Sequence, residues 1–163
     1  ATGLSLSDYT SEKLWKPMGM ESEAYWMIDG SEMGMAFGGL NVGLRDFTRL
    51  GVLYLNGGRW QGKQIVPSDW LVASITPDAP HLMPGTKPNN DETMGYGYQW
   101  WTFDDGSFAA QGIFGQGIFV DPARKLVIAS NGNWPSATPD AQKDQRNAFY
   151  QAVQAYLDSE NAS

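Results

Sequence analysis

Apolar residues recur at helical spacing in four segments, where we expect helices: residues 6–15, 42–55, 67–75 and 140–157. Ser5, which lies in a Ser-x-x-Asp pattern, and Asn41 are the predicted N-caps of the first two helices. We expect Pro17 to end the first helix near Trp15, because proline lacks the N–H that a helix interior needs.

Two of these helices are long enough to define a buried face. In the second helix the apolar stripe consists of Leu44, Phe47, Gly51 and Tyr54, with Leu50 and Leu53 beside it. In the last helix the residues expected to face inward are Ala148, Phe149, Ala152, Val153 and Tyr156. Asn56-Gly57-Gly58 predicts a left-handed C-cap for the second helix, and residues 158–163 are expected to fray.

Extended apolar runs gather in the C-terminal third of the chain. We expect an antiparallel meander of three strands, covering residues 96–103, 108–120 and 126–130. Asp104-Asp105-Gly106 predicts the first turn, because Asp-Gly tolerates a positive φ. The third run is continuously apolar, which favours burial on both faces. Residues 59–60 and 64–66 predict a small hairpin, and residues 25–27 a short strand.

The second run is broken by glycines in the segment Gly112-Ile113-Phe114-Gly115-Gln116. Glycine weakens a strand interior unless something approaches the backbone closely. One interpretation is a strand that presents a free N–H to a substrate carbonyl, as an oxyanion donor does. The other is a twisted or bulged strand at a bend of the sheet. The composition favours neither.

Composition narrows the class of protein. The 163 residues carry a net charge of −7 and include no cysteine. The negative charge argues against a nucleic-acid surface, and no apolar run approaches the about eighteen residues of a membrane-spanning helix. The compartment is left open. Because Ala1 is not an initiator Met, we expect the chain to be part of a longer one.

No complete catalytic or cofactor constellation is present. The sequence holds no Gly-x-Ser-x-Gly, no phosphate loop, no dinucleotide fingerprint and no Ser-x-x-Lys. The only histidine, His81, lies in a proline-rich loop and is interpreted as a surface residue, so neither a metal nor a cofactor is expected. Asp104 and Asp105 are adjacent and belong to a turn signal rather than to a carboxylate pair.

Five segments nevertheless follow the order of a known family: residues 1–9 (ATGLSLSDY), 14–20 (LWKPMGM), 39–51 (GLNVGLRDFTRLG), 95–101 (GYGYQWW) and 112–122 (GIFGQGIFVDP). Together they resemble the C-terminal half of the penicillin-recognising serine hydrolases. That group includes class C β-lactamases, family VIII esterases, D-alanyl-D-alanine carboxypeptidases and 6-aminohexanoate-dimer hydrolases. The resemblance is greatest to the esterase and 6-aminohexanoate-dimer hydrolase branch.

The resemblance implies an α/β (α+β) fold of the β-lactamase/transpeptidase type, with an antiparallel sheet flanked by helices and a helical subdomain. Residues 1–75 would belong to the helical subdomain and residues 76–94 to a surface loop. Residues 95–163 would supply the last strands and the final helix. A small amide or ester would be the substrate. The Ser-x-x-Lys and Tyr-x-Asn/Ser motifs that cleave it would lie before Ala1, in an N-terminal segment of the same fold.

The same resemblance implies the roles of individual residues. The third family motif, Lys-Thr-Gly, falls on Ala110-Gln111-Gly112, where only the glycine matches. The missing lysine argues against tight recognition of a β-lactam carboxylate. The backbone N–H of Ile113 would be one donor of the oxyanion hole. Substrate would contact the segment around this donor and nearby aromatic residues, namely Gly112, Phe114, Gly115, Gln116, Tyr98, Trp100 and Trp101, although core packing explains the aromatic residues equally well.

Two other hypotheses stay open. One is a stand-alone module that binds carbohydrate through its many aromatic residues, and the other is a non-catalytic homologue that binds peptidoglycan-like ligands. An incomplete hydrolase should expose a large apolar face where its missing strands and helix pack. A stand-alone module should instead have a closed core, with exposed aromatic rings in a row.

Overall fold

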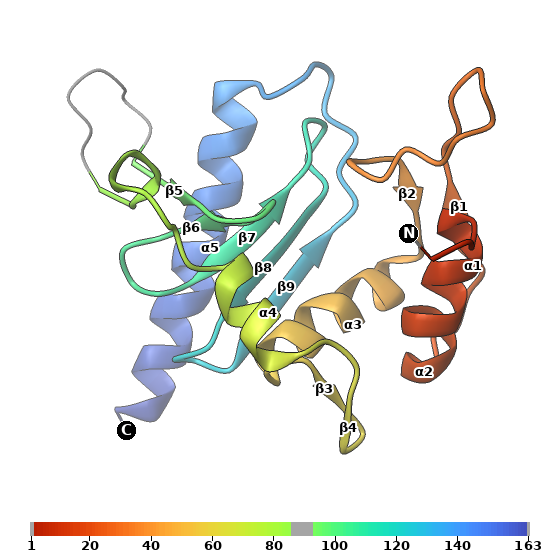
Figure 1. The fold of residues 1–163 in the computed structure, drawn as a ribbon. Coiled ribbons are helices and arrows are strands. Elements are labelled where there is room, and N and C mark those ends of the chain that lie inside the picture. Colours follow the sequence, from red (N-terminus) through yellow and green to blue (C-terminus); the bar gives the residue numbers. More distant parts are fainter. Residues whose placement is uncertain (1, 86–92, 163) are drawn as a thin grey trace.

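A five-stranded antiparallel sheet forms the centre of the computed structural model, which describes residues 2–85 and 93–162 (Figure 1). Its order is β5 (Gly95–Tyr96), β6 (Trp101–Thr102), β7 (Phe108–Gln111), β8 (Gly117–Asp121) and β9 (Leu126–Ser130). Helices lie on both faces of this sheet. The predicted α/β class is therefore confirmed.

The sheet has more strands than the three predicted, because two of the predicted strands are interrupted. The run 96–103 is broken by a turn in which the Gly97 amide donates to the Trp100 carbonyl (2.8 Å) and Gln99 has a φ of 67°. The run 108–120 is a hairpin of β7 and β8, with Gln111 opposite Gly117. The prediction of a strand at residues 112–116 is therefore wrong, and this segment is the hairpin loop.

Burial along the sheet also differs from the prediction. Every residue of β8 is buried, because β8 has a strand on each side and a helix on each face. The residues of β9 are only half-buried, so the prediction that residues 126–130 are buried on both faces is wrong. In the described part of the chain β9 pairs only with β8, which leaves its outer edge open.

One face of the sheet is covered by α3 (Leu44–Leu55). Its side chains Phe47, Leu50 and Tyr54 pack against a core cluster made of Trp100, Phe108, Ile118 and Val120. Gly51 allows the close approach, since a Cβ on it would lie 2.6 Å from Val127 and 2.7 Å from Ile118. The predicted stripe is confirmed except for Leu44, which is 46% exposed in the first turn.

Both ends of α3 follow from local chemistry. The N-cap is Gly43 rather than Asn41, because Asn41 is already paired in strand β2. At the C-terminus the Gly57 amide donates to Tyr54 and the Gly58 amide to Leu53. Both glycines have positive φ, so the predicted left-handed cap is confirmed as a Schellman motif.

The other face of the sheet is covered by α5 (Asp140–Asn161). Its Tyr150 stacks on Phe119 with ring centroids 4.4 Å apart. The predicted inward face is largely wrong: Ala148, Phe149, Ala152 and Tyr156 are exposed, and only Val153 of the five is half-buried. The predicted fraying from residue 158 is also wrong, since the helix continues to Asn161.

Polar groups explain the true orientation of α5. The side-chain amide of Gln154 donates to Asp121, which is 1% exposed (2.7 Å), and Arg124 links Asp121 to Asp158. Burial raises the pKa of Asp121, but hydrogen bonds from Gln154 and Arg124 outweigh burial and hold that pKa below its usual value. A buried carboxylate needs such partners, so the helix turns its polar side chains toward the sheet.

The N-terminal part forms a separate group of elements at the right of Figure 1. It consists of α1 (Leu6–Thr10), a π-helical turn (Ser11–Trp15), α2 (Lys16–Met18), β1 (Tyr25–Trp26) and β2 (Leu40–Asn41). Ser5 caps α1 as predicted, accepting from the Asp8 amide. The predicted end at Trp15 is wrong, because the wider π turn accommodates Pro17 and the helix ends at Gly19, with a φ of 61°.

A buried carboxylate joins these elements to α3. Asp46 is 1% exposed and accepts from the amides of Glu21 and Ser22 (2.9 Å each). Arg49 pairs with both Asp46 and Glu21. Burial raises the pKa of Asp46, and these hydrogen bonds outweigh it and lower the pKa overall. The packing of α3 on the sheet therefore holds the N-terminal elements in place as well.

The remaining elements connect α3 to the sheet. They are the hairpin of β3 (Arg59–Trp60) and β4 (Lys63–Gln64), helix α4 (Ser68–Ser74) and a 3-10 turn at Pro80–Leu82. The predicted hairpin and third helix are confirmed to within two residues. Of the predicted loop at 76–94, residues 86–92 lie outside the described part of the chain. The division of the chain near residue 75 stays a prediction.

Candidate functional site

Three amides of the β7–β8 hairpin loop, residues 112–116, donate hydrogen bonds within the loop. The Gly112 amide donates to the Gln116 carbonyl (2.8 Å), and the Phe114 amide donates to the Gln116 side chain (3.2 Å). The Gly115 amide donates back to the Gly112 carbonyl (3.3 Å). A Cβ on Gly112 would lie 2.6 Å from the Gln116 side-chain oxygen, so a larger residue there would displace the side chain that accepts from the Phe114 amide.

The segment after β9 also forms hydrogen bonds to this loop. The Thr138 amide donates to the Ile113 carbonyl (2.8 Å), and the Trp134 amide donates to the Phe114 carbonyl (3.1 Å). Ser130 donates its hydroxyl to the Gly115 carbonyl (3.0 Å). Residues 130–138 therefore act as a brace along the loop.

The Ile113 amide differs from the adjacent amides of Gly112 and Phe114, which both donate hydrogen bonds. Within residues 2–85 and 93–162 it donates to no acceptor, a property that it shares in this loop with the Gln116 amide. Ile113 is 56% exposed, whereas Gln116 is half-buried. An unpaired N–H in a loop that hydrogen bonds hold in place is the feature required of an oxyanion donor.

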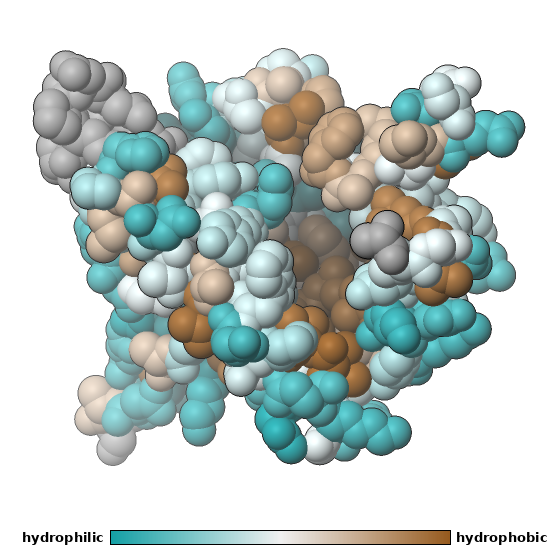
Figure 2. Space-filling model, viewed as in Figure 1, coloured by the Kyte–Doolittle hydropathy of each residue, from teal (hydrophilic) through white to brown (hydrophobic). Residues whose placement is uncertain are grey.

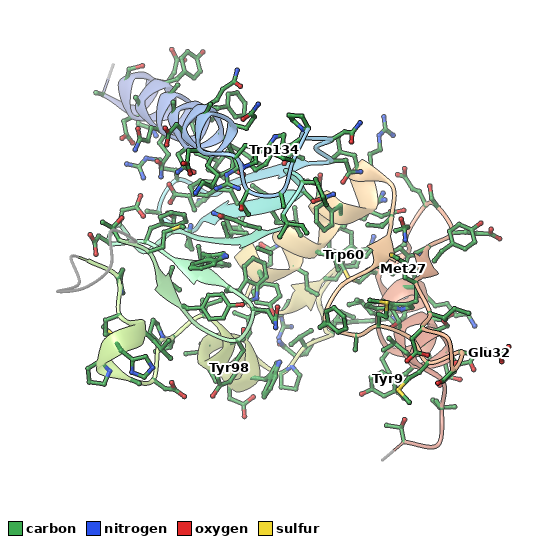
Figure 3. All side chains as sticks on the ribbon, turned by 90° about the horizontal axis from the view of Figure 1, so that it is seen from above. Tyr9, Met27, Glu32, Trp60, Tyr98 and Trp134 are labelled. Carbon is green, nitrogen blue, oxygen red and sulfur yellow. The ribbon has the colours of Figure 1, made fainter. Side chains whose placement is uncertain are left out.

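Aromatic residues lie at the same end of the sheet. Because Trp101 pairs with Ala109 in an antiparallel register, the turn before β6 lies beside the end of β7. Tyr98 in that turn is exposed, its amide donates to the Ser74 carbonyl (2.8 Å), and its ring lies 5.6 Å from that of Trp70. Figure 3 shows Tyr98 next to α4 and Trp134 next to α5, on opposite sides of the sheet.

The other two predicted aromatic contacts are less open. Trp100 is 7% exposed, and its ring packs against Tyr54 (4.4 Å) and Phe108 (5.1 Å) in the core. Trp100 is therefore packed in the core, and its contact with a substrate stays a prediction. Trp101 is half-buried, with its ring 4.8 Å from that of Tyr96.

The remaining candidate residues take the structural roles expected from the sequence. His81 is exposed, and Asp105 accepts from the Ser107 amide (2.9 Å) within its turn. No group of three metal-ligating side chains exists among the described residues. None of the helices in the described part of the chain is both long enough and apolar enough to cross a membrane.

Sequence reasoning missed the brace formed by residues 130–138 and its contact with α5. Arg146 lies with its guanidinium carbon 5.5 Å from the Trp134 ring centroid and donates to the Gln111 side chain (2.9 Å). These residues are far apart in the chain, and no local pattern links them. The one available signal was Trp134 itself, a large aromatic residue within a loop of small and polar residues.

Comparison with known proteins gives a consistent result. The family model described as "Beta-lactamase" matches residues 1–153. The 6-aminohexanoate-dimer hydrolase of Paenarthrobacter ureafaciens is 28% identical over 144 residues, which cover 86% of this chain and 36% of that protein. The solved structure described as "Putative 6-aminohexanoate-dimer hydrolase from Bacillus anthracis" is 30% identical with a TM-score of 0.82, and the match covers 97% of this chain and 40% of that one.

A more distant structure agrees on the fold alone. The protein described as "putative beta-lactamase from Bacteroides dorei DSM 17855" has a TM-score of 0.59 at 15% identity, covering 91% of this chain and 52% of that one. The chain thus spans less than half the length of both hydrolases named above.

Proposed function

The chain belongs to the Beta-lactamase family, and from that premise we propose that it is the C-terminal portion of a serine hydrolase that cleaves amide or ester bonds through an acyl-enzyme. The resemblance to penicillin-recognising serine hydrolases is confirmed by the family match and by the two 6-aminohexanoate-dimer hydrolase relatives. In this proposal the chain supplies the oxyanion donor and one wall of the substrate pocket. The Ser-x-x-Lys and Tyr motifs come from a preceding segment.

The unpaired amide of Ile113 is the observation that carries this proposal. Neighbouring amides of the loop are bonded within it, and the brace fixes the carbonyls of Ile113 and Phe114. The Ile113 N–H is therefore held in a fixed direction without being used. A preorganised donor of this kind stabilises charge that develops in a transition state, because it needs no reorganisation when the reaction occurs.

The chemistry follows from that donor. The serine oxygen attacks the substrate carbonyl carbon, and the C=O π electrons move onto the oxygen, which becomes an oxyanion. The Ile113 N–H donates a hydrogen bond to that oxygen. The Lys and Tyr of the family motifs take the serine proton and pass it to the leaving amine or alcohol. Water then attacks the acyl-enzyme and releases the acid, again through an oxyanion at the same donor.

The wall of the pocket would be formed by the loop and the turn beside it. Gly112, Phe114, Gly115 and Gln116 surround the donor, and Tyr98 and Trp101 lie at the same end of the sheet. Phe114 and Tyr98 are both exposed, so their rings are available to an apolar acyl chain. The relatives named for 6-aminohexanoate dimer make a linear amide the first substrate to try.

The exposed apolar surface supports a partner segment from the same fold. Leu44 on α3 and both Trp70 and Val72 on α4 are exposed, and exposed apolar surface can be covered by another segment or protein. Figure 2 shows brown side chains in the floor of a hollow between the sheet and the N-terminal elements. The open edge of β9 can also accept a further strand.

Replacing Ile113 by Pro in the hydrolase that carries this chain tests the proposal. Proline removes the N–H and breaks no hydrogen bond of the loop, since that N–H has no acceptor in the described structure. We expect kcat/KM for an activated ester to fall by about a hundred- to a thousandfold. Ile113→Val is the matched control, because it changes the side chain and keeps the donor.

Equal turnover of the Pro and Val variants would contradict the donor role of Ile113. An alkyl fluorophosphonate probe tests the class of enzyme separately, because it labels an activated serine. A properly folded protein that never reacts with the probe would instead be a non-catalytic homologue.

A further inference from the structure

Trp134 and Arg146 form a clamp that sets the position of the hairpin loop from the side of α5. Trp134 lies in the brace after β9, and Arg146 lies in the second turn of α5. Figure 3 shows Trp134 next to α5. The two residues are joined by a cation–π contact of 5.5 Å, measured from the guanidinium carbon to the ring centroid.

The indole ring of Trp134 is in close contact with the loop. An added Cβ on Gly115 would lie 2.5 Å from the indole atoms Cε2 and Nε1, and Gly115 has a φ of 91°. The backbone of Trp134 also donates to the Phe114 carbonyl (3.1 Å). Gly115 is therefore glycine for two reasons, a positive φ and the space that the indole occupies.

The guanidinium group of Arg146 connects the clamp to the opposite end of the loop. It donates to the side-chain oxygen of Gln111 at 2.9 Å. Gln111 is the last residue of β7 and directly precedes Gly112. The clamp therefore contacts the loop on both sides of Ile113, at Gln111 and at Gly115.

We propose that Trp134 and Arg146 are positioning residues, which aim the Ile113 N–H at the developing oxyanion by holding both ends of the loop. This inference rests on the proposed function of Ile113. Neither side chain contacts the reacting atoms. A displacement of about 1 Å at such a donor can slow a reaction by roughly a hundredfold, so a loose clamp should lower kcat and leave substrate binding intact.

The test compares Trp134→Ala with Trp134→Phe, and Arg146→Met with Arg146→Lys, in the intact hydrolase. We expect the Ala and Met variants to lower kcat by about 10- to 100-fold with KM within about twofold. The Phe variant should recover most of the rate, because it keeps an aromatic face for the cation. Tyr156→Ala, an exposed aromatic truncation on the same helix, is the control and should keep full activity.

The double variant adds a second measurement. If Trp134 and Arg146 act as one unit, Trp134→Ala combined with Arg146→Met should lower kcat little more than the worse single change. Amide hydrogen exchange at Phe114 and Gly115 should become faster in Trp134→Ala, a result that does not depend on catalysis.

The outcomes separate this inference from the proposed function. An unchanged kcat in Trp134→Ala, with Ile113→Pro still inactive, overturns the clamp and keeps the donor. A parallel change of kcat and KM in both Trp134 variants also overturns it, because that pattern reports a general structural loss. Faster exchange in Trp134→Ala, together with an active Ile113→Pro, keeps the clamp as a mechanical feature and removes the donor.

Discussion

The two faces of the sheet are held by different forces. Between the sheet and α3 the contact is apolar, with Phe47, Leu50 and Tyr54 packed on the cluster around Phe108 and Ile118. Between the sheet and α5 only a small apolar cluster exists, and buried polar groups complete the contact. The α3 face therefore depends on shape and buried area, whereas the α5 face depends on particular hydrogen-bond partners.

This difference matters for the site, because the α5 face is the one that reaches the hairpin loop. Apolar packing fixes a helix through shape complementarity spread over many contacts, whereas each hydrogen bond fixes one point of the helix through a particular partner. Gln154 and Arg146 place α5 on the sheet at two points, one at Asp121 and one at Gln111. The first point anchors the helix, and the second connects it to the loop that carries Ile113.

Of the substitutions that test the two faces of the sheet, Asp121→Ala should lower the unfolding free energy most. The change leaves Arg124 and Gln154 without the carboxylate that both contact, inside the interface of α5 with the sheet. Removing the acceptor of these two hydrogen bonds should cost about 2 kcal/mol of unfolding free energy. Urea unfolding measures this loss. Asp158→Ala removes the exposed partner of the same arginine and should cost much less than Asp121→Ala, because water screens an exposed ion pair.

The pH dependence of the unfolding free energy also tests the role of Asp121. Because the pKa of Asp121 is lowered in the folded protein, its contribution is present above the unfolded value of about 3.9. It is lost as the pH falls through the folded pKa. The wild type should therefore lose more stability between neutral and strongly acidic pH than Asp121→Ala does. Equal losses in the two proteins would contradict the role given to this carboxylate.

A smaller effect is expected from Gly51→Ala on the α3 face. In an exposed helix this change would stabilise by up to about 1 kcal/mol. Here the added methyl group meets Val127 at 2.6 Å and Ile118 at 2.7 Å, so we expect a net loss of about 1–2 kcal/mol instead. Unfolding by urea gives the sign directly, and a more stable variant would show that the α3 face is loosely packed.

The same difference explains which parts of the fold could be predicted. Hydrophobic spacing identified α3 and most of its buried stripe, because burial there follows apolarity. For α5, hydrophobic spacing predicts the wrong buried face, because Arg146, Asn147 and Gln154 face the sheet and Phe149 faces solvent. A pattern of apolar residues cannot show that the buried carboxylate of Asp121 accepts a hydrogen bond from a side-chain amide on a distant helix.

The candidate site was predicted in part. The sequence predicts a substrate site at the glycine-rich segment and a strand as its geometry, but the segment is a hairpin loop. A thirteen-residue strand from Phe108 to Val120 was already long against a usual five or six residues. The positive φ of Gly115 needed a turn at that position. The clamp of Trp134 and Arg146 required the three-dimensional structure, since it joins three segments of the chain.

The most direct test of the donor role proposed for Ile113 is the structure of the proposed longer protein after reaction with an alkyl fluorophosphonate. The covalent adduct on serine mimics the tetrahedral intermediate, with a phosphonyl oxygen in the position of the oxyanion. We predict that this oxygen lies about 2.7–3.1 Å from the Ile113 backbone nitrogen. An adduct whose phosphonyl oxygen receives its hydrogen bonds elsewhere, while the Ile113 amide bonds another protein atom, would contradict the central claim.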